Sequence, residues 1–156
     1  MNNQISPCLW FDNQAEEAAL FYTSVFKNSK ITAVSRYGKE GFEFHRQKEG
    51  TAMVVAFEIN GQSFTALNGG PVFKFNEAVS FQVYCDSQEE IDYYWNKLTE
   101  GGEESSCGWL KDKYGLSWQV VPSILPQLMS DPARKGRVTN AFMQMKKFDI
   151  AKLEQA

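Results

Sequence analysis

Few residues in this sequence could take part in covalent or metal chemistry. There are three cysteines, Cys8, Cys85 and Cys107, and one histidine, His45. One histidine cannot build a two-histidine metal site, and the cysteines form neither a CxxC pair nor an even set, so a disulfide framework and a zinc knuckle are not expected. Cys107 is the candidate nucleophile, because it lies beside Gly108 in a polar stretch, whereas the other two cysteines lie in apolar, strand-like segments.

Two carboxylates, Glu77 and Asp112, are candidate general bases. No acid–base pair is fixed by the spacing of either residue. Asp112 lies between Lys111 and Lys113, a position typical of a turn residue. The sequence therefore leaves open a metal-independent enzyme that uses Cys107, without defining its acid–base partner.

The chain that must position these residues repeats itself once. The segment 9–22 begins Leu-Trp-Phe-Asp and leads to Phe21-Tyr22, and the segment 83–95 begins Val-Tyr-Cys-Asp and leads to Tyr93-Tyr94. With one residue skipped, their aspartates, glutamate pairs and aromatic pairs align about 73 positions apart. Each copy reads as a strand, a capped turn and an amphipathic helix. A two-copy period of this length predicts two similar half-domains rather than a solenoid.

Hydrophobic periodicity predicts one helix and four strands in the first half. Asp12 or Asn13 is the expected N-cap of the helix, which ends near Phe26. Asn60-Gly61 predicts a two-residue type I′ hairpin, because both residues tolerate positive φ. The expected strands cover residues 5–11, 30–37, 51–59 and 62–67, and residues 38–50 form a polar loop.

The second half repeats this order and then continues. Ser87 and Glu90 form a capping-box pattern that begins a helix ending at about Thr99, where Gly101-Gly102 stops it. The expected strands cover residues 78–85, 103–110 and 116–121. Beyond Pro122, two more helices are expected, over residues 125–129 and 136–146, and these have no counterpart in the first half.

The composition is that of a packed globular protein. Apolar residues make up 43% of 156 residues, and the formal net charge is −3. This charge, with no dense stripe of lysine and arginine, gives no support to nucleic-acid binding. No apolar run has the ~18 residues that a membrane span needs, and no signal peptide is recognisable. A cytoplasmic protein with neither nucleic acid nor membrane as partner is expected.

Several segments of the chain match the motifs of one family: Trp10-Phe11-Asp12, Phe21-Tyr22, residues 64–71 (Phe-Thr-Ala-Leu-Asn-Gly-Gly-Pro), 73–78, 107–112 and 115–122. In these segments the chain resembles the vicinal oxygen chelate superfamily, which includes glyoxalase I, bleomycin-resistance proteins and extradiol dioxygenases. The sequence of these segments is most similar to the PhnB-like branch, which is named 3-demethylubiquinone-9 3-methyltransferase. The resemblance implies an α+β fold of two tandem βαβββ modules in a single domain, residues 1–156, with module one at 1–70, module two at 77–122 and a helical extension at 123–156.

Metal-using members of this superfamily hold a divalent ion with His or Glu on four strands. The resemblance carries these positions onto Pro7, Ala78, Gln119 and a residue within 65–67. Proline and alanine supply no ligand atom, and an amide oxygen is a weak substitute for a carboxylate. We therefore expect neither a metal nor another cofactor. The methyltransferase name is also unsupported by the residues, because Gly69-Gly70 leads into a proline rather than into a nucleotide-binding helix.

The resemblance implies a cleft whose lining is mostly apolar with a few neutral polar groups, as in organic-ligand pockets. We expect it to be lined by Leu9, Phe11, Asn68, Ser80, Gln82, Trp109, Ser117 and Gln119. The predicted function is binding of a small organic molecule without a metal, and the alternative is a metal-independent enzyme. Ser80, Gln82 and Gln119 could instead satisfy one another in a filled core. A homodimer is expected, formed through residues 72–75 and the helical extension. The ligand and any reaction stay open.

Overall fold

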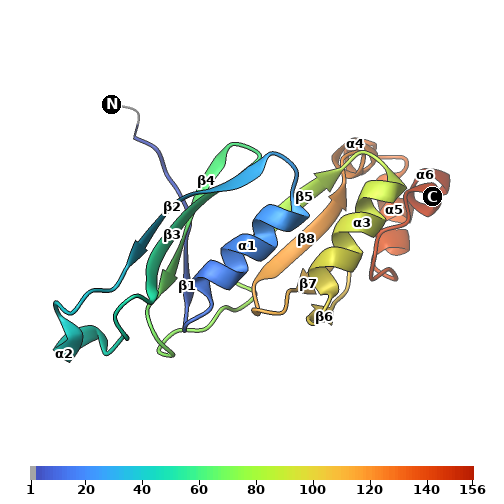
Figure 1. Ribbon diagram of the computed structural model, residues 1–156. Coiled ribbons are helices and arrows are strands. Elements are labelled where there is room, and N and C mark those ends of the chain that lie inside the picture. Colours follow the sequence, from blue (N-terminus) through green and yellow to red (C-terminus); the bar gives the residue numbers. More distant parts are fainter. Residues whose placement is uncertain (1–2) are drawn as a thin grey trace. The chain divides into compact units, whose positions relative to one another are not determined.

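Two mixed four-stranded sheets organise the chain in the computed structural model, which describes residues 3–156 (Figure 1). The chain divides into two compact units, residues 1–74 and 75–156. Strand order is β1-β4-β3-β2 in the first sheet and β5-β8-β7-β6 in the second. In each sheet the first strand of the unit lies at the edge and pairs in parallel with the last strand. The predicted α+β fold with a repeated topology is confirmed.

The first unit is a sheet with one long helix on one face (Figure 1). Its elements are β1 (Cys8–Phe11), α1 (Ala15–Val25), β2 (Ser29–Arg36), α2 (Phe42–His45), β3 (Ala52–Ile59) and β4 (Gln62–Asn68). The hairpin at Asn60 and Gly61 forms as predicted, with φ of 49° and 79°. The short helix α2 lies in the segment that was expected to be only a loop.

An apolar layer between α1 and its sheet forms the core of the first unit. Tyr22 of α1 stacks on Phe57 of β3, with ring centroids 6.2 Å apart, and Phe57 stacks on Phe64 of β4 at 5.3 Å. All three rings are buried. Burial of each such side chain stabilises the fold by about 1.5–3 kcal/mol, so this aromatic stack fixes which face of the sheet carries the helix.

The N-terminus of α1 is capped by a residue distant in the sequence. The N-cap is Gln14, and its side chain makes no capping hydrogen bond, so the prediction of Asp12 or Asn13 as N-cap is wrong. The Asn68 side chain instead accepts a hydrogen bond from the Ala15 N–H at 2.8 Å and donates one to the Ala52 carbonyl at 2.9 Å. Asn68 is 1% exposed, so both of these hydrogen bonds lie inside the core.

The second unit repeats the sheet and its helix and adds helices after β8. Its elements are β5 (Ser80–Cys85), α3 (Gln88–Thr99), β6 (Glu103–Glu104), β7 (Trp109–Lys111), β8 (Ser117–Pro122), α4 (Leu125–Ser130), α5 (Lys135–Phe142) and α6 (Ile150–Gln155). The Ser87 hydroxyl accepts from the Glu90 N–H at 3.2 Å, which confirms the predicted N-cap. The Glu90 carboxylate completes the capping by accepting from the Asp86 N–H at 2.8 Å.

Residues 103–110 form a hairpin, so their prediction as one strand is wrong. β6 pairs antiparallel with β7, and the chain reverses between them. Cys107 and Gly108 adopt positive φ, 56° and 80°, which extended strands do not contain. Gly108 also lacks room for a side chain, because a β carbon there would collide with the Phe148 ring.

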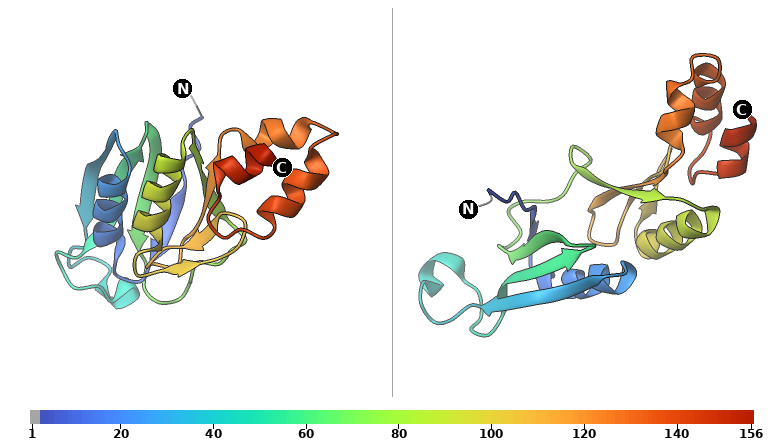
Figure 2. Two further views of the ribbon diagram at one scale, coloured as in Figure 1. Left: turned by 90° about the vertical axis from the view of Figure 1, so that its right-hand side faces the viewer. Right: turned by 90° about the horizontal axis from the view of Figure 1, so that it is seen from above.

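The helices α4, α5 and α6 form a C-terminal extension of the second unit. Figure 2 shows them on the side of the second sheet opposite α3. The two predicted helices are confirmed with shifted bounds, whereas α6 was missed because it has only six residues. Asp149 caps α6 by accepting from the Lys152 N–H at 3.1 Å. None of the helices within residues 3–156 is long and apolar enough to cross a membrane.

Candidate functional site

The face of the second sheet opposite α3, here called the polar face, carries rows of polar side chains. Strand pairing aligns Ser80 with Ser117, Ser117 with Lys111, and Lys111 with Glu103. Directly paired residues share one face of a sheet, so these side chains form a first row across the four strands. The next row is Gln82, Gln119 and Trp109, and the third row contains Tyr84 and Val121.

Hydrogen bonds connect these three rows along the sheet. The Tyr84 hydroxyl donates to the Gln82 amide oxygen at 3.2 Å, and the Gln82 amide donates to the Gln119 oxygen at 3.5 Å. The Gln119 amide nitrogen then donates to the Ser80 hydroxyl at 2.8 Å. An amide NH₂ has two donors and its oxygen accepts two bonds, so Gln82 and Gln119 keep hydrogen-bonding capacity beyond these contacts. We call these four residues the amide relay.

A pocket of about 350 Å³ lies over the second and third rows. We call it the amide pocket. It is lined by Gln82, Tyr84, Cys107, Trp109, Gln119, Val121, Leu125, Pro126, Met129, Phe142 and Phe148. None of these described residues is an aspartate, glutamate, lysine, arginine or histidine. A few neutral polar groups on an apolar wall are characteristic of sites for small organic molecules.

The C-terminal extension is fixed against this sheet by polar contacts. The Gln88 side chain donates to the Phe148 carbonyl at 3.0 Å and accepts from the Ile150 N–H at 2.9 Å. The backbone N–H groups of Cys107 and Gly108 donate to carbonyls of residues 145 and 146 at 2.8 Å and 2.7 Å. The wall that the extension contributes to the amide pocket is therefore held in place, not loosely apposed.

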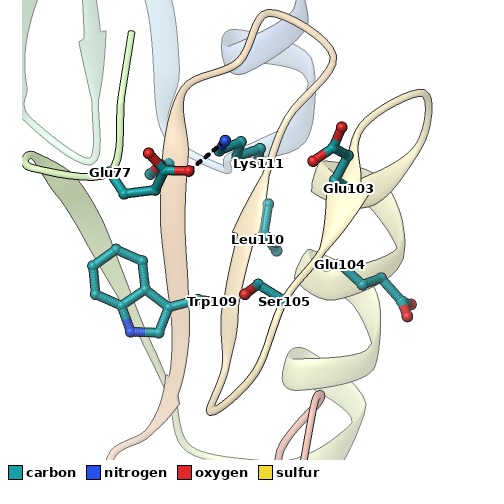
Figure 3. A pocket seen from close by; sticks show the side chains of 8 residues that line it. Glu77, Glu103, Glu104, Ser105, Trp109, Leu110 and Lys111 are labelled. Atoms are coloured by element: carbon teal, nitrogen blue, oxygen red, sulfur yellow. Dashed lines mark ion pairs between the residues drawn. The ribbon is translucent and has the colours of Figure 1, made fainter.

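A second hollow, of about 390 Å³, lies on the other side of Trp109 and is charged (Figure 3). We call it the charged pocket. It is lined by Glu77, Glu103, Glu104, Ser105, Trp109, Leu110, Lys111 and Ser117. In Figure 3 the Glu77 carboxylate faces the Lys111 ammonium, with which it forms an ion pair. The Ser117 hydroxyl is buried and is without a hydrogen-bond partner in the described part of the chain.

Paired charges dominate the electrostatics of the charged pocket. The hydrogen bond from Lys111, followed by a backbone hydrogen bond and then by the Lys111 charge, holds the pKa of the Glu77 carboxyl below its ordinary value. The same contact raises the pKa of Lys111. Glu104 is engaged as well, because its carboxylate accepts from the Trp95 indole N–H at 2.9 Å. Neither Glu77 nor Glu104 is therefore an unengaged general base.

The structure brings five of the predicted cleft residues together, Ser80, Gln82, Trp109, Ser117 and Gln119. All five lie on the polar face of the second sheet. Ser80, Gln82 and Gln119, which could satisfy one another, do so through the amide relay. That relay lies beside a pocket rather than within a filled core.

The other three predicted cleft residues lie in the first unit and line neither pocket. Leu9 and Phe11 are 6% and 3% exposed in its core, and strand pairing aligns them with Ala66 and Asn68. Because the Asn68 side chain caps α1, this is the face of the first sheet that carries the helix. Alternation grouped Leu9 and Phe11 correctly with each other, but it could not tell which face the helix covers.

The catalytic candidates lie in different surroundings. Cys107 lines the amide pocket, and its thiol donates to the Phe142 carbonyl at 3.6 Å. Asp112 is 2% exposed and accepts hydrogen bonds from the Tyr114 and Leu116 N–H groups and the Trp118 indole at 2.9–3.1 Å. Asp112 therefore has the environment of a structural turn residue.

Sequence reasoning missed the aromatic and aliphatic wall of the amide pocket. Tyr84 follows Ser80 and Gln82 in strand alternation, so the period-two pattern could have placed it on the same face. Apart from Val121 on β8, the remaining missed residues come from the extension: Leu125, Pro126, Met129, Phe142 and Phe148. Phe142 lies in the helix predicted over residues 136–146, but no signal in the sequence indicates which surface that helix covers.

The donors of the amide relay do not fit a divalent-cation site. They are amide and hydroxyl groups, which are weak ligands for transition metals. Within residues 3–156 no three side chains of His, Cys, Asp or Glu come together in a group that could hold a metal ion.

Sequence and structure comparisons identify similar proteins. Residues 3–121 match the 3-demethylubiquinone-9 3-methyltransferase family. The chain is similar to a PhnB protein from Bacillus cereus that carries the same methyltransferase name, with 38% sequence identity, coverage of 78% of this chain and 100% of that chain, and a TM-score of 0.69. A comparison with curated protein sequences finds no match.

Two more distant structures share the fold. Protein PA1353 from Pseudomonas aeruginosa is 20% identical, with 76% of this chain and 96% of that chain covered and a TM-score of 0.61. The fosfomycin resistance protein FosX from Listeria monocytogenes is 13% identical, with 81% and 98% covered and a TM-score of 0.53. At such identities the likeness concerns the fold alone.

Proposed function

This chain belongs to the 3-demethylubiquinone-9 3-methyltransferase (PhnB-like) family of the vicinal oxygen chelate superfamily, and from that premise we propose that its second unit binds a small organic molecule, without a metal ion, in the amide pocket. The observation that carries the proposal is the amide relay at an uncharged pocket. Gln82 and Gln119 offer donors and acceptors beyond those used within the relay. The apolar wall supplies the area from which a ligand of this size gains most of its affinity.

Binding, rather than methyl transfer, is the activity proposed here. The glycines of the motif at residues 64–71, Gly69 and Gly70, are followed by Pro71, and residues 69–79 contain no helix. A nucleotide-binding turn would place a helix N-terminus after its glycines. The family name is therefore retained for the family and not extended to the reaction.

The alternative function is a metal-independent enzyme that uses Cys107. Its thiol lines the same pocket, but none of the described lining residues is cationic, and a reactive thiolate needs a positive group nearby. Alkylation of Cys107 by iodoacetamide across pH 6–10 separates the two functions. A rate that rises only above about pH 8 supports binding. A rate already maximal at pH 6 would indicate an activated nucleophile.

A fragment screen followed by ¹H–¹⁵N spectra tests the proposed function. Neutral fragments small enough for a 350 Å³ pocket are added to labelled protein in the presence of EDTA. We expect binders to shift the backbone signals of Gln82, Trp109 and Gln119 and to leave those of Cys8 and Thr65 unchanged. A library that shifts none of the three signals, or shifts them only after a divalent metal is supplied, would overturn the proposal.

A homodimer and a cytoplasmic location are also proposed. Support for the dimer comes from Val72 and Phe73, which are 72% and 61% exposed, since an exposed apolar pair of this kind is typical of an interaction surface. Sedimentation of the wild type and of Phe73→Asp tests it. We expect a dimer that the substitution dissociates, and a monomeric wild type would contradict it. Fractionation of cells tests the location.

A further inference from the structure

The C-terminal extension, residues 123–156, lies beyond the part of the chain that matches the family. The family match ends at residue 121, and the Bacillus cereus relative is covered completely by 78% of this chain. The extension nevertheless supplies the outer wall of the amide pocket, through Leu125, Pro126, Met129, Phe142 and Phe148. The relay that forms the floor comes from the family part, and the wall comes from the addition.

We infer that the extension sets the ligand selectivity of this pocket, and that its ligands are neutral molecules with an aromatic or alicyclic body and one hydrogen-bonding group. The inference rests on the proposed function, since it names the class of molecule that the same pocket takes. The body packs on Phe142 and Met129, and the hydrogen-bonding group meets the Gln82 and Gln119 amides.

Neutrality follows from how charge is distributed around Trp109. On one side lies the charged pocket, with three glutamates and Lys111. On the other side, none of the described residues lining the amide pocket is charged. An ion buried against amides and hydrocarbon loses hydration without gaining a counter-charge, which disfavours its binding. The amide pocket therefore discriminates against both anions and cations.

The preference for a ring follows from the side chains that the extension brings. Phe142 and Phe148 lie with ring centroids 6.2 Å apart and ring planes at 68°, an edge-to-face pair. Trp109 lies on β7 across the same pocket. A planar ring between such walls gains both buried area and aromatic contacts. The thioether of Met129 adds a polarisable contact.

The position of the extension is specified by residues in the family part of the chain. Gln88 at the start of α3 binds the backbone on both sides of Asp149. Gly108 leaves space that the Phe148 ring occupies. The Lys147 ammonium pairs with Asp92 at 2.6 Å. A helical addition that only covered apolar surface would not need these specific contacts.

A matched pair of fluorescent dyes tests the inference. N-phenyl-1-naphthylamine is uncharged at neutral pH, and 1-anilinonaphthalene-8-sulfonate has the same ring system with an added sulfonate. We expect the neutral dye to bind one site per chain and the sulfonate to bind at least about tenfold more weakly. Phe142→Ala should weaken the neutral dye about tenfold. The control Phe44→Ala, at a ring 86% exposed on α2, should leave it unchanged.

Each outcome of the dye experiment supports or overturns the inference. Equal affinity for the two dyes overturns the ligand class. Neutral-dye binding that is unchanged in Phe142→Ala, with the protein still folded by circular dichroism, overturns the role of the extension. Where Phe142→Ala does not fold, Met129→Ala takes its place, with a loss of about three- to tenfold expected. If neither dye binds while neutral fragments still shift the Gln119 signal, the inference falls and the proposed function stands. If no fragment binds either, both fall.

Discussion

The two units share one topology but differ in what covers and lines their sheets. The repeat pairs Trp10 with Tyr84, so Cys8 corresponds to Gln82, and strand pairing makes Thr65 the counterpart of Gln119. Where the second unit has two amides that bond to each other, the first unit has a thiol and a hydroxyl. In the second unit, the helices that follow the sheet pack onto its polar face. The comparison shows how one copy of a duplicated scaffold can build a pocket together with an added extension.

The units also differ in how the long helix begins. α1 depends on Asn68, 53 residues beyond the N–H that it caps, whereas α3 is capped by Ser87 three residues before its partner. The Asn68 cap links α1 to β3 and β4 through a buried side chain. The Ser87 cap is local and partly exposed to solvent. Loss of each cap should therefore have very different consequences.

Removal of the Asn68 side chain is expected to have the largest effect. Asn68→Ala leaves the Ala15 N–H and the Ala52 carbonyl buried without partners, and each such group costs about 1–3 kcal/mol. We expect a loss of about 3 kcal/mol in the free energy of unfolding, measured with urea. The matched variant Ser87→Ala should lose about 1 kcal/mol. Equal losses would contradict the contrast between the two caps.

The reactivity of two cysteines on corresponding strands should differ by at least about a hundredfold. Burial raises the pKa of the Cys85 thiol to about 12, with smaller contributions from Glu90 and Asp86, whereas Cys8 is exposed. Because the folded pKa is raised, Cys85 favours folding below the ordinary thiol pKa, and this stability is lost as the pH rises towards 12. Mass spectrometry after brief iodoacetamide treatment at pH 8.5 checks the difference. Similar labelling of both thiols in the folded protein would refute it.

Replacement of the central amide should affect binding rather than folding. Gln119→Leu removes the relay contacts to Ser80 and Gln82 but keeps the size of the side chain. We expect affinity for N-phenyl-1-naphthylamine, or for the best neutral fragment, to fall about tenfold, which is about 1.4 kcal/mol. Thr65→Val, the corresponding change in the first unit, should leave the affinity unchanged. A loss in Thr65→Val as large as that in Gln119→Leu would contradict a pocket confined to the second unit.

Acid pH should weaken binding slightly through the extension. Hydrogen bonds from Lys147 and Gln88 hold the pKa of the Asp92 carboxyl below its ordinary value. The ion pair therefore contributes above the ordinary carboxyl range and is lost as the pH falls through the lowered pKa. We expect affinity for the neutral dye to fall about two- to threefold as the pH is lowered from 7 through the lowered pKa of Asp92. Lys147→Ala should show a weaker pH dependence, and a full pH effect in that variant would assign it to another group.

Local signals in the sequence predicted much of this fold. The Asn60-Gly61 hairpin and the Ser87–Glu90 cap were predicted because their partners lie within four residues. The repeated strand order could be predicted because both copies keep the same apolar alternation. The shared face of Ser80 and Gln82, and that of Ser117 and Gln119, were also predicted, since period-two alternation decides which residues of one strand share a face.

Long-range and non-local features escaped prediction for physical reasons. Asn68 caps a helix from a distant strand, and nothing near Asn68 in the sequence indicates that contact. The 103–111 hairpin reverses at Cys107, a residue type that rarely adopts positive φ. Helices were predicted in the extension, but nothing in the sequence indicates the surface they cover, so about half of the amide pocket could be found only in three dimensions.

A crystal structure of the protein grown with saturating N-phenyl-1-naphthylamine is the most direct test of the central claim, that the polar face of the second sheet is a ligand site. The account predicts electron density for the dye between Gln119 and Phe142, with a polar contact to the Gln82 or Gln119 amide and no metal ion. Dye bound elsewhere, or side chains that fill the amide pocket, would contradict it.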